Sequence, residues 1–108
     1  MDTLLPTWDG RSKFKYRGTV NTGTDIHYSK DFYYKISITA AEYRRMLGAF
    51  KGLDVPCGTA REIEKRPEDS LGYWIGQNIT KTAIASYLAQ ILIHESFAKK
   101  KDRILSFN

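Results

Sequence analysis

The residue types that most often perform catalysis or bind metals are few in this chain and do not form one motif. The two histidines, His27 and His94, each lie close to a carboxylate in the sequence. Such a pair needs a third partner before it makes a catalytic triad or a metal site. The single cysteine, Cys57, could meet His27 as a thiol nucleophile, although a lone apolar cysteine is more often buried. We therefore expect no metal and no cofactor, and a binding protein more readily than an enzyme.

Aromatic residues are abundant, with seven tyrosines, five phenylalanines and two tryptophans in 108 residues. Most of these rings are needed for the core of so small a domain. Tyrosine and tryptophan also line pockets and interfaces, because their rings are rigid and carry one polar group. We predict a ligand pocket between sheet and helices, lined by Tyr28, Tyr34, Tyr73, Trp74, His27 and Cys57.

The chain is basic, with 17 lysines and arginines against 12 acidic residues and a net charge of +5. This balance favours polyanionic partners, although it is also normal for a small soluble protein. Alternation in "KFKYRGTV" places three cations on one face of a strand, and a fourth joins them from the next predicted strand. A nucleic-acid-binding surface is therefore predicted at Lys13, Lys15, Arg17, Lys35, Lys99, Lys100, Lys101 and Arg103. The alternative is a solvated face whose strand lysines discourage aggregation.

The most apolar stretch, "TKTAIASYLAQILI" at 80–93, begins like the first helix of a helix-turn-helix motif. The following residues do not continue that motif. Gln90 and Glu95 would fall at its buried positions, and no glycine supplies a turn before residue 93. As one helix, the stretch instead presents a continuous apolar stripe that belongs in the core or under a second subunit. The predicted homodimer interface consists of Trp74, Ile84, Leu88 and Ile91.

Periodicity and caps predict the elements that position these residues. Alternating apolar residues indicate strands at 13–20 and 31–38, paired as a hairpin across a loop at 21–29. A capping box, Thr39 with Glu42, starts an amphipathic helix over 40–51. Further helices are expected around 70–78 and 81–93. A third strand is expected from 53–57 or 103–107, because two strands alone are marginally stable.

These features predict one small α+β domain. We expect an extended N-terminal arm at 1–12 and a single domain at 13–108, in which a small antiparallel hairpin or sheet is covered by amphipathic helices as a single pair of layers. The N-terminus lacks the pattern of a signal peptide, and the apolar run at 83–93 is about half the length of a membrane span. A cytoplasmic location without a membrane partner is expected, and a single cysteine suits a reducing compartment.

Three functional hypotheses follow, from different classes. The first is a small non-catalytic interaction or ligand-binding module that self-associates as a homodimer, through the 71–93 region or a sheet edge. The second is a nucleic-acid-binding protein that uses the basic strand face. The third is a small-molecule-binding protein or small enzyme built around His27, Cys57 and the aromatic residues.

Overall fold

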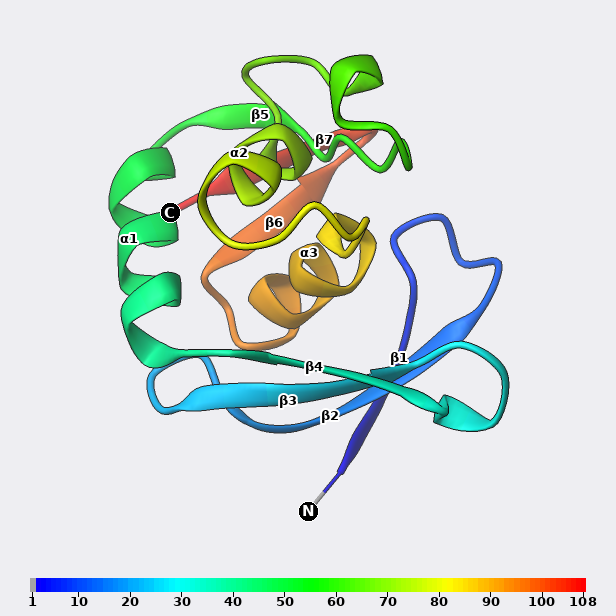
Figure 1. Ribbon diagram of the computed structural model, residues 1–108. Helices are drawn as coiled ribbons and strands as arrows, with labels where there is room; N and C mark the ends of the chain where they lie inside the picture. Colours follow the sequence, from blue (N-terminus) through cyan, green and yellow to red (C-terminus); the bar gives the residue numbers. More distant parts are fainter. Residues whose placement is uncertain (1) are drawn as a thin grey trace.

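Two antiparallel β-sheets enclose helix α3 in the computed structural model, which describes residues 2–108 (Figure 1). Sheet A has the strand order β1-β2-β3-β4, and sheet B has the order β5-β7-β6. The strands are β1 Thr3–Pro6, β2 Lys13–Thr19, β3 Gly23–Tyr28, β4 Tyr34–Ile38, β5 Asp54–Pro56, β6 Ala98–Lys101 and β7 Ile104–Phe107. The helices are α1 Ala40–Phe50, α2 Leu71–Asn78 and α3 Ala85–His94, with 3-10 helices η1 Lys30–Phe32 and η2 Ile63–Lys65. The predicted α+β class is confirmed.

The predicted hairpin between 13–20 and 31–38 is wrong, because strand β3 lies between these two segments. β3 pairs with β2 on one side, where Ile26 faces Tyr16, and with β4 on the other, where Ile26 faces Ile36. The prediction of a loop at 21–29 rests on turn-forming residues, which are frequent there. Thr24 and Ile26 nevertheless both lie buried on the inner face, at the spacing of two residues that is typical of a strand.

Sheet B uses both segments that the sequence offered as alternatives for a third strand. Residues 54–56 and 104–107 pair with each other, with Val55 opposite Leu105, and neither joins the first sheet. The β6–β7 hairpin completes this second sheet, so one pair of layers becomes two sheets with helices between and beside them (Figure 1). The apolar side chains of Val55, Leu105 and Phe107 are buried against the helices.

Helix α1 begins with the predicted capping box. The Glu42 amide donates a hydrogen bond of 3.1 Å to the Thr39 hydroxyl, and the Thr39 amide donates one of 2.8 Å to the Glu42 carboxylate. The apolar stripe of the helix buries Tyr43, Met46 and Phe50. Burial of each such side chain stabilises the fold by about 1.5–3 kcal/mol.

Helix α3 lies at the centre of the molecule and is a single uninterrupted helix (Figure 1). Ile84, Leu88 and Ile91 have no exposed surface within one chain. The structure therefore corrects the assignment of these three residues to a subunit interface: they are core residues, and a partner cannot reach them. They were ambiguous in the sequence because an apolar stripe of this kind suits the core and an interface equally well.

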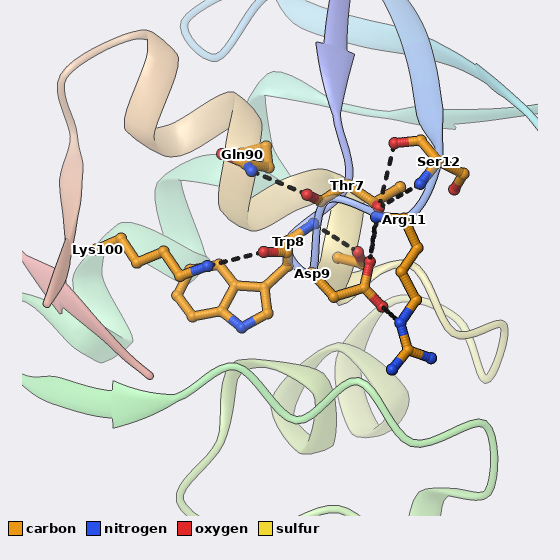
Figure 2. Close-up of polar contacts among 8 residues, drawn as sticks. Thr7, Trp8, Asp9, Arg11, Ser12, Gln90 and Lys100 are labelled. Atoms are coloured by element: carbon orange, nitrogen blue, oxygen red, sulfur yellow. Dashed lines mark hydrogen bonds and ion pairs between the residues drawn. The ribbon is translucent and has the colours of Figure 1, made fainter. Parts of the chain in front are cut away.

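The loop between β1 and β2 is bound to α3 and to sheet B, as Figure 2 shows. The Trp8 amide donates a 2.9 Å hydrogen bond to the Ser86 hydroxyl, and the Gln90 side chain donates one of 3.0 Å to the Thr7 carbonyl. The Lys100 ammonium donates a 2.8 Å hydrogen bond to the Trp8 carbonyl and lies 4.2 Å from the centre of the indole ring. The N-terminal segment is thus tied to the core by contacts from two other elements.

Within residues 2–108, none of the helices combines the length and the apolar character that crossing a membrane requires.

Candidate functional site

Three of the predicted pocket residues line two hollows that share lining residues. Tyr28 and Tyr34 line a hollow of about 410 Å³. Tyr73 lines a neighbouring hollow of about 510 Å³. Both hollows are bordered by Arg61 and Lys81. We call the two hollows together the tyrosine groove, lined by Tyr28, Tyr34, Tyr73, Tyr87, Arg61 and Lys81.

The other three predicted pocket residues lie elsewhere. Successive residues of β3 point to opposite faces of sheet A, so His27 lies on the outer face and the neighbouring Tyr28 on the inner face. Trp74 packs edge-on against Phe50, with ring centres 6.1 Å apart. Cys57 is only 3% exposed, its sulfur lies 3.6 Å from the Ala85 carbonyl oxygen, and burial raises the pKa of its thiol to about 12. Cys57 and His27 therefore do not form the nucleophilic pair that the sequence allowed.

The rings of the groove form a row that runs from the core to the surface. Phe14 contacts Tyr87 with ring centres 5.0 Å apart, and Tyr87 contacts Tyr28 at 5.1 Å. Tyr28 and Tyr34, which are opposite each other in the β3–β4 register, stack at 5.8 Å. Tyr34 is 54% exposed, so the row ends in a ring with a free surface. An exposed ring held by stacked neighbours is a platform for another flat ring.

The turn between β3 and β4, which connects Tyr28 to Tyr34, has an unusual backbone conformation. Ser29, Asp31 and Phe32 have φ angles of 73°, 58° and 54°, in the left-handed region that residues other than glycine rarely adopt. Such positions cost free energy and cluster at functional sites. The turn presents Tyr33, which is 80% exposed and lies edge-on to Tyr34 at 5.2 Å.

Arg66 is a buried residue that connects the segments carrying the groove's cations, Arg61 and Lys81. Its side chain is 4% exposed and donates four hydrogen bonds to main-chain carbonyls. Nε binds Ala60 at 2.7 Å and Nη1 binds Gly72 at 2.8 Å. Nη2 binds the carbonyls of both Arg61 and Lys81, at 3.1 and 3.3 Å. One guanidinium therefore joins the two loops that carry the groove's surface cations.

Arg61 and Lys81 form no ion pair with any of residues 2–108, and Arg66 has no carboxylate partner there either. Glu62, which lines the larger hollow, lies 4.0 Å from Lys65. The rim thus offers two cations without partners beside a row of rings. This combination can hold a ligand that has both a flat ring and a negative charge.

Sequence reasoning did not find Arg61, Arg66, Lys81 or Tyr87 as members of a site. Tyr87 stands within the apolar stripe of 80–93 and so looked like a core residue. The three cations come from segments with no motif. Only contacts between distant segments distinguish them.

Four of the predicted nucleic-acid-binding residues, Lys13, Lys15, Arg17 and Lys35, lie together on the outer face of sheet A. Acidic side chains share this face. The Asp2 carboxylate lies 3.0 Å from Arg17 and 3.7 Å from Lys15. Asp25 accepts a 2.6 Å hydrogen bond from Ser37, which lowers the pKa of its carboxyl group and favours its charged form. The face therefore carries mixed charge.

The second basic group, Lys99, Lys100, Lys101 and Arg103, lies on the β6–β7 hairpin of sheet B. Helix α3 separates this hairpin from sheet A (Figure 1). Lys100 is held against Trp8 by the contacts in Figure 2. The two basic groups consequently do not converge on one face.

Within the part of the chain that the structure describes, no three histidine, cysteine or acidic side chains come together in a way that could hold a metal ion. Comparisons with protein-family models, with curated proteins and with solved structures give no match for this chain.

Proposed function

We propose that this protein is a non-catalytic binding module, and that its tyrosine groove takes a planar ring bearing an anionic group, as in a nucleotide. The observation that carries the proposal is the Arg66 clamp. Its Nη2 atom binds the main-chain carbonyls of Arg61 and Lys81 at 3.1 and 3.3 Å, and so holds together the two segments that carry these cations beside the stacked rings of Tyr28 and Tyr34.

The dimensions of the groove support a ligand of this size. Its two hollows measure about 510 and 410 Å³, within the range of small-molecule sites. The exposed surface of Tyr34 would stack against the ring, and Arg61 and Lys81 would contact the anion. Stacking of a base on an aromatic side chain contributes about 1–3 kcal/mol.

Binding is favoured over catalysis by the position of the one thiol. Cys57 lies in the core, and burial raises the pKa of its thiol to about 12, which leaves little of the reactive thiolate at neutral pH. A free buried cysteine also suits a reducing compartment, so a cytoplasmic location remains part of the proposal. Self-association remains part of it too, through a surface other than the α3 stripe.

A nucleotide can come from solution or from a single strand of nucleic acid, and both present the same ring and phosphate. A titration followed by amide NMR shifts shows whether the ring, the anion or both are needed for binding, and whether a strand binds more tightly. The probes are adenosine for the ring alone, inorganic phosphate for the anion alone, adenosine monophosphate for both, and a short oligoadenylate for the strand. We expect the monophosphate to bind more tightly than either part, with shifts at Tyr28, Tyr34, Arg61 and Lys81. Tighter binding of the oligoadenylate would identify the strand as the source.

Matched variants test the site itself. Tyr34→Ala removes the exposed ring and Arg61→Gln removes a cation, and each should weaken monophosphate binding about tenfold. The controls are Leu53→Ala, which removes another side chain about half exposed, and Arg103→Gln, which removes an exposed cation from sheet B. Equal binding by all four variants, or shifts confined to the outer face of sheet A, would overturn the proposal.

A further inference from the structure

The strands at the edges of the two sheets differ in their protection against pairing with another chain. An unprotected edge presents free amide and carbonyl groups, and proteins commonly guard it with proline, lysine or a short strand. β1 ends in Pro6, and β5 has three residues and ends in Pro56. β6 carries three consecutive lysines. Three of the four edges are therefore guarded.

The fourth edge, β4, is the least guarded of the four. It has five residues, Tyr34–Ile38, with one lysine and no proline, and it is bonded to β3 alone. β4 stands at one end of the strand order of sheet A, next to β3 (Figure 1). Ile36 and Ile38 add branched side chains that favour strand pairing.

We propose that β4 pairs antiparallel with β4 of a second copy of this chain, so that the two copies of sheet A join into one continuous sheet. With Ile36 on the two-fold axis, all five residues of the strand find a partner. Lys35 then faces Ser37 of the second copy, and Tyr34 faces Ile38. A two-fold interface requires such self-complementarity, because the same surface is used twice.

Charge selects this register over its neighbours. Ser37 donates a 2.6 Å hydrogen bond to Asp25, which is its direct neighbour across the β3–β4 pair. Lys35 of one copy therefore comes beside Asp25 of the other, on the outer face where both side chains are accessible. A register centred on Lys35 would instead place two lysines opposite each other, which is unfavourable. On the inner face, the half-buried Ile36 gains a second apolar contact.

The dimer does not depend on a ligand and is therefore separable from the binding function proposed above. Tyr34 belongs to both β4 and the tyrosine groove, and the antiparallel pairing places the grooves of the two copies at opposite ends of the joined strands. Loss of nucleotide binding would leave the dimer intact.

Sedimentation equilibrium of the full chain without ligand tests the proposal. We expect a reversible dimer at micromolar concentration. Ser37→Lys should weaken dimerisation by at least about tenfold. It places a new lysine opposite Lys35 of the other copy in two positions, one on each side of the two-fold axis. Ser12→Lys adds the same charge at an exposed site away from β4 and should leave dimerisation unchanged. Adding Lys35→Glu to Ser37→Lys should restore the dimer by pairing opposite charges.

Cysteine pairing tests the register directly. Residues 35 and 37 are exposed on the outer face, so a cysteine at either position should leave the fold intact. The thermal transition of each variant checks this. A mixture of Lys35→Cys and Ser37→Cys chains should form more disulfide-linked dimer under mild oxidation than either chain alone. Wild-type protein that stays monomeric, equal effects of Ser37→Lys and Ser12→Lys, or no enrichment in the mixture would overturn the proposal.

Discussion

The Tyr16 hydroxyl donates a 2.6 Å hydrogen bond to the Glu95 carboxylate and so joins strand β2 to the C-terminal end of α3. The second oxygen of the same carboxylate accepts a 2.9 Å hydrogen bond from the Val20 amide. Burial, together with the hydrogen bond to Glu95, raises the pKa of Tyr16 well above its ordinary value. One carboxylate thus secures the central helix against sheet A at two points.

Removal of the hydrogen bond between Tyr16 and Glu95 should lower the free energy of unfolding, and the effects of replacing the two residues should not be additive. We expect Tyr16→Phe to cost about 1.5 kcal/mol and Glu95→Ala about 2 kcal/mol, because hydrogen bonds to charged groups are among the stronger ones. Urea unfolding of both single variants and the double variant should give a coupling energy of about 1 kcal/mol or more. Glu68→Ala, at an exposed position, serves as the control. Additive effects of Tyr16→Phe and Glu95→Ala would show that the hydrogen bond contributes nothing.

Alkaline pH should destabilise the protein through its buried hydroxyls and thiol. Burial raises the pKa of Tyr16, of Tyr43 and of Cys57, the last from 9.0 to about 12. The unfolded chain loses these protons at lower pH than the folded chain does. Stability is therefore complete below about pH 9 and falls as the pH rises through the unfolded values, by about 1.4 kcal/mol per pH unit for each group. Chemical denaturation between about pH 8 and about pH 11 measures this slope, and Tyr16→Phe should reduce it. A flat profile would contradict the assignment.

Replacement of Arg66 should damage both the fold and the groove. Arg66→Lys keeps the charge, but an ammonium group cannot reach four carbonyls in the planar arrangement that the guanidinium uses. Carbonyls left without donors should lower the free energy of unfolding by about 3 kcal/mol. Lys65→Met, at the exposed neighbouring position, should change it by less than about 0.5 kcal/mol. Comparable unfolding midpoints for the two variants would show that the hydrogen bonds of Arg66 do not stabilise the fold.

The helical glycines should respond to alanine in a definite order. A Cβ on Gly72 would overlap the Gly58 carbonyl oxygen, which belongs to rigid backbone, so Gly72→Ala should be severely destabilising. A Cβ on Gly76 would lie 2.9 Å from Ile63 Cδ1, the flexible end of a side chain, so Gly76→Ala should cost less. Gly48 in α1 has open space around it, and Gly48→Ala should stabilise the protein by about 0.5–1 kcal/mol. Thermal melts rank the three, and any other order would contradict the packing of α2.

Local signals predicted the elements that neighbouring residues specify among themselves. The capping box of Thr39 and Glu42 fixed the start of α1, and the stripe that includes Leu88 fixed α3 as one helix. The strand at 13–20 followed from alternation. Each of these patterns needs only residues within a few positions of one another, because helix caps and side-chain periods are local properties.

Pairing partners could not be predicted in the same way. The sequence at 23–28 contains residues typical of turns, and only the presence of β2 and β4 on either side makes it a strand. Likewise, the stripe on α3 suits a core or an interface, and the two sheets around it decide for the core. Strand propensity depends on the neighbours that a segment finds, so it is settled by long-range contacts.

The sequence by itself therefore determined the class of fold, the capped start of α1, and which faces are apolar. Tertiary structure alone decided that Tyr28, Tyr34, Tyr87, Arg61 and Lys81 meet in one groove. The reason is physical: Arg66 binds carbonyls from segments up to 15 positions away, and a buried guanidinium forms those bonds only after the chain has brought them together.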